Sequence, residues 1–161
     1  MKRGGPVRGI PLFRRWGARA VMRRVPAFRD AVNLACRARA GHGDARNAIC
    51  EACGALLGPD GGEVRPRLAY VTGTCPPGVF RGPANGVLLC GSVFPLSGCR
   101  ARAWAMDPEM GARGFRIRPG TGLAHDPRHV PVVLGGGGAP GVTVWLSPDG
   151  TYASEPPVRD A

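Results

Sequence analysis

The sequence has few large aromatic side chains and no long apolar segment. It contains five Phe, three Trp and two Tyr among 161 residues, against 26 Gly and 17 Pro. Much of its other apolar content is Ala, which buries little surface per residue. This composition is close to that of loop-rich chains and argues against a large hydrophobic core. The length fits one domain with appendages or two very small domains, and we expect another interaction to assist apolar burial.

Membrane-spanning and secretory segments are also missing. A spanning helix needs about 18 consecutive apolar residues, and charged residues or prolines interrupt every apolar run here. The apolar stretch at 10–13 is far too short for the core of a signal peptide. The sequence therefore predicts a soluble, intracellular protein of the cytoplasm. An arginine-rich, acid-poor N-terminus is also typical of organellar transit peptides, which is kept as a minor alternative.

Acidic residues are nearly absent from the first 40 positions, where 11 basic residues accompany Asp30 alone. The whole chain has a formal net charge of +11, so its excess positive charge lies mainly at this end. We interpret residues 1–26 as a basic Arg/Gly/Pro arm that attracts DNA through phosphate contacts without reading its sequence. The arginines of this arm expected to bind nucleic acid are Arg14, Arg15, Arg19, Arg23 and Arg24. An acidic protein partner, or a coding bias toward arginine, would also account for the charge.

The apolar pattern predicts a helix and then a body of short strands. Apolar residues recur at intervals of three and four along 27–40, which indicates a helix with one buried stripe that ends at Gly41. A linker continues to residue 46, and a short helix is also expected at 13–24. The predicted domain spans 47–157 and closes in a β-hairpin at 142–153. The stripe of the first helix consists of Phe28, Val32, Ala35 and Cys36.

The cysteines carry the clearest chemical signal. Cys50 and Cys53 form a C-x2-C pair followed by glycine, and Cys90 and Cys99 form a second pair with eight residues between them. Two such pairs are typical of a tetrahedral site in which four thiolates hold a structural Zn²⁺. Metal binding of this kind is coupled to folding and would supply the missing cohesion. Two disulfides are the alternative, but they need an oxidising compartment.

The other cysteines and the histidines show no ligand spacing. Cys36 and Cys75 are predicted to be buried as small apolar residues. His42 lies in a Gly-rich linker and is expected to be exposed. His125 and His129 flank Asp126, but the proline between them disfavours a shared helical face, so a solvated turn is preferred to a cation site. The side chains of Trp104 and Met106 are expected to lie in the core.

Two segments of the sequence resemble a known family. Residues 81–91 read RGPANGVLLCG and residues 97–100 read SGCR, after the C-x2-C pair. Further along, the pairs Gly114-Phe115 and Asp126-Pro127 precede a Val-Pro-Val run and a tryptophan-containing hairpin. Together these features resemble the HNH endonuclease family, in a bacterial or phage-encoded form with a four-cysteine zinc knuckle. The resemblance covers about two thirds of the chain.

The resemblance implies a small α+β fold of the ββα-metal type. Strands around 62–72 and 85–90 would form a zinc-braced hairpin with the knuckle, and a helix would start near Cys99. By the same resemblance the activity is phosphodiester hydrolysis of DNA, with a catalytic divalent cation such as Mg²⁺ beside the scissile phosphate. Asn85 matches the family's motif asparagine.

Both motif histidines, however, are replaced in this chain. The resemblance puts the general-base histidine at Pro66 and the second histidine at Arg100, and no histidine occurs between residues 54 and 98. Proline has no titratable group, and arginine neither accepts a proton nor ligates a cation at neutral pH. We therefore expect a weak or inactive nuclease, a pseudoenzyme in which Arg100 and Arg102 contact phosphate. The alternatives are a non-catalytic zinc-containing DNA-binding module, or a protein-interaction module with a patch of Trp104, Trp145 and Phe115.

Overall fold

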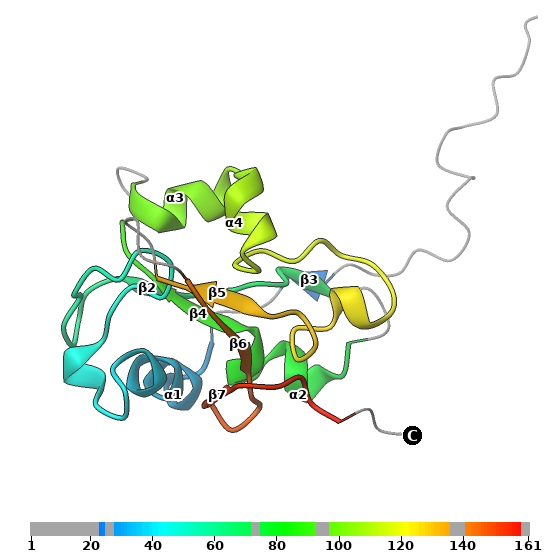
Figure 1. Cartoon of the computed structure of the whole chain (residues 1–161), viewed down its shortest axis with the longest axis horizontal. Coiled ribbons are helices and arrows are strands. Elements are labelled where there is room, and N and C mark those ends of the chain that lie inside the picture. The colour runs from blue at the N-terminus through cyan, green and yellow to red at the C-terminus, as the bar shows by residue number, and fades with distance from the viewer. Residues whose placement is uncertain (1–22, 25–27, 72–74, 93–96, 136–140, 159–161) are drawn as a thin grey trace, which may run out of the picture.

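The chain forms a mixed α+β structure made of short elements (Figure 1). The computed structural model describes residues 23–24, 28–71, 75–92, 97–135 and 141–158. The helices are α1 (Asp30–Ala40), α2 (Pro77–Phe80), α3 (Gly98–Trp104) and α4 (Pro108–Ala112), with 3-10 turns η2 (Ala45–Asn47), η3 (Pro83–Asn85) and η4 (Leu123–His125). In the described ranges, none of the helices has the length and apolarity that crossing a membrane requires.

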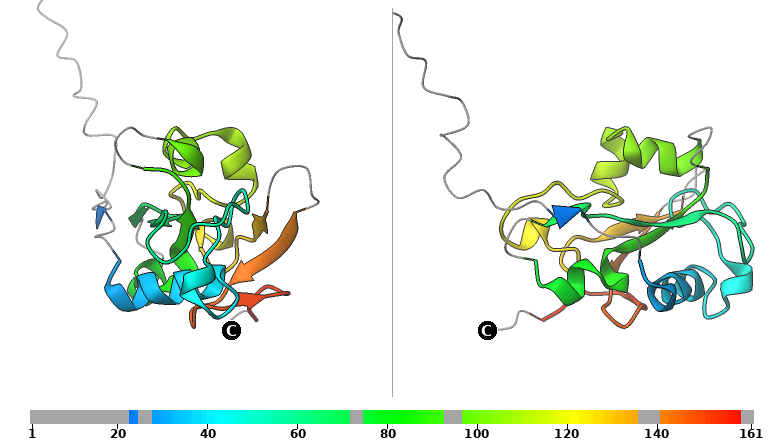
Figure 2. Two further views of the ribbon diagram at one scale, coloured as in Figure 1. Left: turned by 90° about the vertical axis from the view of Figure 1, so that its left-hand side faces the viewer. Right: turned by 180° about the vertical axis from the view of Figure 1, so that it is seen from behind.

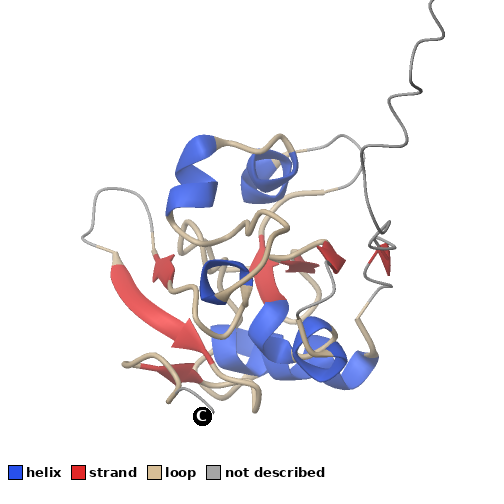
Figure 3. Cartoon of the chain, turned by 90° about the vertical axis from the view of Figure 1, so that its right-hand side faces the viewer, coloured by secondary structure: helices blue, strands red, loops and turns tan. Residues whose placement is uncertain are grey.

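The strands form three small antiparallel sheets. They are β1 (Arg23–Arg24), β2 (Glu63–Pro66), β3 (Tyr70–Val71), β4 (Gly86–Leu89), β5 (Val132–Leu134), β6 (Val142–Leu146) and β7 (Tyr152–Ala153). Strand β1 pairs with β3, β2 pairs with β4, and β5, β6 and β7 follow one another in the third sheet. Loops connect most of these elements, as Figure 3 shows.

The pairing of β2 with β4 confirms the predicted strand pair, although both strands are shorter than expected. Val64 lies opposite Leu88, and Pro66 lies opposite Gly86. Helix α3 follows β4 and begins one residue before Cys99, as predicted. The order strand, strand, helix is thus present, with the second pair of cysteines at the junction of β4 and α3.

Helices cover the strands from two sides. Helices α3 and α4 lie on one side of the strands and α1 lies on the other, in the front and rear views alike (Figures 1 and 2). The predicted helix at 27–40 is confirmed over Asp30–Ala40, with Gly41 as its C-cap. Its Cys36 and Ala40 are buried against Val64 and Leu88. The sequence placed this helix correctly because its apolar spacing matches its buried face.

Strand β4 lies between two apolar clusters and is buried along its whole length. Side chains of a strand alternate between its two faces. Val87 and Leu89 therefore join the larger cluster with Met110, Phe115 and Leu146, while Leu88 joins the cluster under α1. Two of the cysteines predicted to bind metal, Cys50 and Cys99, belong to the larger cluster.

The C-terminal part contains the predicted hairpin and two elements that were not expected. Strands β6 and β7 pair as predicted, with Leu146 opposite Tyr152. Strand β5 adds to the free edge of β6, and α4 forms where Asp107 accepts a hydrogen bond from the backbone N–H of Glu109 at 2.9 Å. Within the predicted helix at 13–24, residues 13–22 lie outside the described residues, and Arg23–Arg24 form a strand instead.

The prediction that Trp104 and Met106 lie in the core is wrong. They are 56% and 55% exposed. Arg100 and Trp104 stand four residues apart on α3, so they share one face of the helix, and this face borders a cavity. Met106 has a positive φ of 60° in the turn between α3 and α4, which directs it away from the cluster. Phe115 is fully buried, so the predicted patch with Trp104 and Trp145 does not form.

Candidate metal centre and adjoining cavity

Tight turns place the two cysteine pairs opposite each other. In the first pair, the backbone N–H of Gly54 donates to the carbonyl of Cys50 at 2.8 Å, and Gly54 has a φ of 76°. In the second pair, Gly91 and Gly98 allow the backbone segments next to Cys90 and Cys99 to lie close together. A Cβ atom on Gly91 would lie 1.9 Å from the carbonyl oxygen of Ser97, so this close approach requires glycine.

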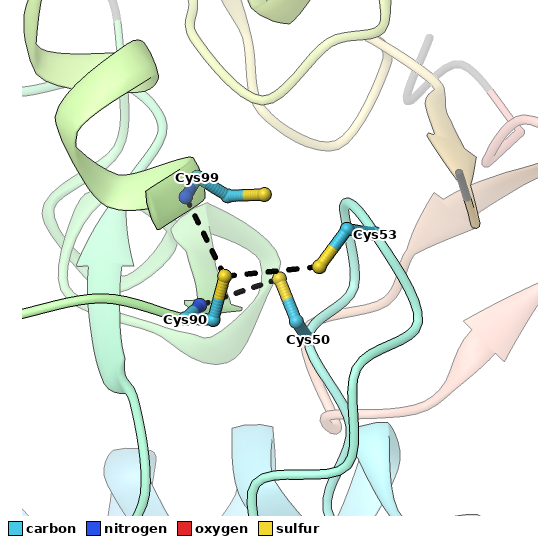
Figure 4. A group of neighbouring side chains, drawn as sticks. All are labelled: Cys50, Cys53, Cys90 and Cys99. Carbon is cyan, nitrogen blue, oxygen red and sulfur yellow. Dashed lines mark hydrogen bonds between the residues drawn. The ribbon is translucent and has the colours of Figure 1, made fainter. Parts of the chain in front are cut away.

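The four predicted ligands form one cluster (Figure 4). Their Sγ atoms all lie within 4.8 Å of one another, and the Sγ atoms of Cys53 and Cys90 are 3.7 Å apart. Zinc–sulfur bonds of about 2.3 Å in a tetrahedron put the sulfurs about 3.8 Å apart. The cluster could therefore hold a metal ion. Thiolate ligands favour soft ions such as Zn²⁺.

Backbone amides surround the sulfurs. The N–H of Cys90 donates to Sγ of Cys50 at 3.3 Å, and the N–H of Cys99 donates to Sγ of Cys90 at 3.4 Å. The hydrogen bond from the Cys99 thiol lowers the pKa of Cys50 to about 5, whereas the same bond raises the pKa of Cys99. Burial raises the pKa of Cys53. The lowered pKa favours the thiolate form of Cys50, which is the form that binds metal.

A buried ion pair anchors the first cysteine pair, and sequence reasoning missed it. Glu51, between Cys50 and Cys53, accepts hydrogen bonds from Nε of Arg39 at 3.0 Å and from the Tyr152 hydroxyl at 2.7 Å. Arg39 also donates to the carbonyl of Gly86 at 2.7 Å. Burial opposes the charge of Arg39, but the carboxylate of Glu51 outweighs it and raises the arginine pKa. The one sign of this ion pair in the sequence is the position of Glu51 between Cys50 and Cys53.

The predictions for the other cysteines and for His42 are confirmed. Cys36 and Cys75 are buried away from the cluster, and burial raises the pKa of each thiol to about 11. His42 is exposed. Nδ1 of His125 lies 2.7 Å from the carbonyl oxygen of Arg118. Within the described ranges the four cysteines are the only group of three or more metal-ligating side chains.

A cavity of about 620 Å³ lies beside β2, β3 and α3. It brings together Pro66 and Arg100, which lie far apart in the sequence and which the family resemblance assigns to the two motif histidines. Three arginines and one glutamate give the lining an excess of positive charge, and four aromatic rings complete it. These residues are Arg65, Arg100, Arg116, Glu63, Phe28, Tyr70, Trp104 and Phe115.

Arg100 has an unsatisfied donor at this cavity. Its side chain is 5% exposed, and its Nη1 lies 2.7 Å from Oε2 of Glu63. Its Nε is buried and has no hydrogen-bond partner among the residues that the structure describes. A buried donor without an acceptor costs free energy unless a ligand supplies one. Glu63 also pairs with Arg65 at 3.1 Å, so both arginines share one carboxylate.

Asn85 is fully buried and does not line the cavity. Its Oδ1 accepts from the backbone N–H of Leu68 at 2.7 Å, and its Nδ2 donates to the carbonyls of Leu68 and Phe80 at 3.0 and 2.9 Å. The two bonds to Leu68 hold the backbone that follows Pro66, and the third holds the last residue of α2. The structure therefore gives Asn85 a positioning role.

Of the predicted DNA-binding arginines, Arg23, Arg24, Arg100 and Arg102 lie in the part of the chain that the structure describes. Arg102 donates to Asp107 at 2.7 Å and to Glu109 at 2.6 Å, and these bonds raise its pKa. Arg24 lies opposite Tyr70 in the β1–β3 pair, and Tyr70 is one of the residues that line the cavity. Arg14, Arg15 and Arg19 lie outside the described residues.

Comparison of the chain with protein-family models, with curated proteins and with solved structures gives no match. The resemblance to the HNH family thus rests on the motifs of the sequence alone.

Proposed function

We propose that this chain is an HNH-like domain, stabilised by a structural Zn²⁺, that binds DNA and does not cleave it efficiently. The observation that carries the proposal is the shared cavity of Pro66 and Arg100 beside the four-cysteine cluster. It is supported by the order of the elements, in which the β2–β4 pair is followed by α3 and the cysteines flank the junction.

The residues around the cavity do not support hydrolysis. By the resemblance, an active member uses one histidine to activate water and another to hold the cation next to the phosphate. Pro66 accepts no proton, and Arg100 repels a cation from the position where a ligand is needed. The nearest carboxylate, Glu63, is engaged by two arginines. The motif positions therefore offer a positive charge that can bind phosphate, but they offer no general base that can activate water.

Positive charge around the cavity and in the arm would supply the affinity. Arginines contact DNA mainly through phosphate oxygens, and release of counterions makes such binding weaken steeply with salt. Phosphate contacts of this kind position the protein without specifying a base sequence.

The test uses the full zinc-loaded chain with duplex DNA and a supercoiled plasmid. We expect duplex affinity to fall steeply as salt rises from 50 to 200 mM, by at least tenfold. Plasmid incubated with Mg²⁺ or Mn²⁺ should stay intact, and nicking should appear only in a Pro66→His, Arg100→His double variant. Robust cutting by the unaltered protein would contradict the proposal, as would the absence of DNA binding at low salt.

The second candidate is a protein-interaction module. The exposed side chains of Leu56, Trp104 and Met106 favour it, since large apolar groups at the surface are common at interfaces. The burial of Phe115 removes one member of the predicted patch, so DNA binding is the better supported of the two.

A further inference from the structure

We infer that the cavity beside α3 receives a single unpaired nucleotide of DNA, with its phosphate on Arg100 and its base against Trp104 and Tyr70. This inference rests on the proposed function and deepens it, because it names the form of DNA that the site accepts. A volume of about 620 Å³ is in the range of small-ligand pockets, about 300–1,000 Å³. One unstacked nucleotide is a ligand of this class, whereas bases inside a duplex are hidden in the stack.

Arg100 supplies the phosphate site. Its Nε is a buried donor with no partner in the described part of the chain, and an anion at the cavity would satisfy it. Its Nη1 stays on Glu63, which holds the planar guanidinium in place. Arginine is well suited to this role because its fork of donors matches the oxygens of a phosphate. Arg65 and Arg116 add positive charge to the same wall.

The aromatic residues supply the base site. Trp104 is 56% exposed and Tyr70 is 37% exposed, and both line the cavity. Phe28 and Phe115 complete its apolar wall. Base stacking on aromatic rings is the common device of single-strand recognition, and it tolerates any base sequence. The exposure of Trp104, which is a poor arrangement for a core residue, is what a stacking platform requires.

Strand β1 connects this cavity to the basic arm. Arg24 lies opposite Tyr70 in the β1–β3 pair, so the arginine-rich segment joins the described fold at a residue of the cavity wall. Eleven of the first 40 residues are basic. Contacts of the arm with phosphates would raise the affinity for any DNA, while the cavity would select DNA that offers an unpaired end.

The experiment compares fluorescein-labelled blunt duplex DNA with the same duplex carrying a single-stranded overhang, by fluorescence anisotropy with the full chain. We expect the overhang DNA to bind about tenfold more tightly than the blunt DNA. A Trp104→Ala variant should lose this preference, because loss of one stacked base weakens binding by about tenfold or more. Leu34→Ala is the matched control, since Leu34 is 61% exposed on α1 and does not line the cavity.

A competition assay tests the phosphate site. Deoxyadenosine monophosphate should displace the overhang DNA from the cavity, whereas deoxyadenosine should not. Arg100→Lys keeps a positive charge beside Glu63 but lacks the Nε donor, so it should abolish competition by the monophosphate. Thermal unfolding of each variant identifies any loss of folding. If Arg100→Lys does not fold, the comparison of the monophosphate with the nucleoside on the unaltered chain decides whether the site takes a phosphate.

Three results would overturn the inference. Equal affinity for blunt and overhang DNA, unchanged by Trp104→Ala, would remove the nucleotide site and leave the proposed DNA binding intact. Equal competition by the nucleoside and the monophosphate would remove the phosphate role of Arg100. Failure to bind either DNA at low salt would overturn both the inference and the proposed function.

Discussion

Buried arginines join separate segments of this fold through hydrogen bonds, in a chain that has few large aromatic side chains. Arg67 is 1% exposed, and its guanidinium donates to four backbone carbonyls in the C-terminal part of the chain. Burial, together with the charge of Arg39, lowers the pKa of Arg67. The four carbonyls belong to Gly114 at 2.6 Å, Pro127 at 2.9 Å, Val130 at 2.7 Å and Pro131 at 3.2 Å. A single side chain thus joins the segment after β2 to the loops before β5.

The pair of Arg39 and Glu51 gives a prediction at the scale of one residue. A Glu51→Gln variant leaves the buried guanidinium of Arg39 without a counter-charge, so the free energy of unfolding should fall by about 3–5 kcal/mol. Denaturant unfolding followed by circular dichroism measures this change. Tyr152→Phe, which removes only the hydroxyl bond to Glu51, should cost less, about 1.5 kcal/mol.

The exposed pair of Arg46 and Asp44 is the control for this prediction. Their side chains are 82% and 37% exposed, and the pair is 2.9 Å long. Exposed ion pairs contribute little to stability, so Arg46→Ala should leave the unfolding curve unchanged. A similar small effect of Glu51→Gln would show that the buried pair does not hold the first cysteine pair in place.

Sequence reasoning reached the cysteines and missed the buried charges for a physical reason. The spacing of Cys50 and Cys53 is a local signal for a tight turn, and it can be recognised without reference to distant residues. The burial of Glu51 depends instead on Arg39, 12 residues earlier, and on Tyr152, 101 residues later. A charged residue is buried only when its partner is brought to it by the fold, so composition and periodicity alone predict it as exposed.

At the scale of elements, the junction between β4 and α3 controls whether the cysteine pairs meet. Gly91 has a φ of 108° and Gly98 has a φ of 67°. The backbone N–H of Arg100 donates to the carbonyl of Cys90 at 3.0 Å across this junction. The close approach of Gly91 to Gly98 therefore sets the distance between Cys90 and Cys99.

A Gly91→Ala substitution tests this junction. A Cβ atom there would meet the backbone of Ser97, and the positive φ would be strained as well. We expect a loss of about 2 kcal/mol or more of unfolding free energy and weaker binding of metal. Gly111→Ala is the control, because Gly111 lies in α4 with open space around it and should be neutral or slightly stabilising. Equal unfolding midpoints for the two variants, with equal metal content, would contradict the role of the junction.

Elements with local signals were predictable and elements that depend on distant pairing were not. Helix α1 has a three-and-four apolar spacing and a glycine stop, and the β6–β7 hairpin has a Pro-Asp-Gly turn. Strands β1 and β5 have only two and three residues. Strand β1 exists through its pairing with β3, and β5 through its pairing with β6. The sequence predicted Trp104 on α3 to be a core residue. In a sequence, an apolar residue that lines a cavity looks the same as one that is buried in the core.

For the whole molecule, the four-cysteine cluster joins the first cysteine pair to the junction of β4 and α3. Cys50 and Cys99 belong to the larger apolar cluster, whose other members come from β4, α4 and the third sheet. A metal held by the four sulfurs would fix the first cysteine pair to the β4–α3 junction. Because such a site does not exist in the unfolded chain, the free energy of metal binding adds to the stability of the fold.

Removal of the metal should therefore destabilise the fold. The purified full chain should contain one zinc ion, measured by elemental analysis, and an excess of a strong chelator should lower its thermal midpoint by at least 10 °C, since structural sites contribute several kcal/mol. Cys99→Ser should lower the zinc content and the midpoint together. Cys75→Ala, which removes a buried thiol outside the cluster, should lower the midpoint without changing the zinc content. Full zinc content in Cys99→Ser, or an unaltered midpoint after complete chelation, would show that the cluster is not a structural metal site.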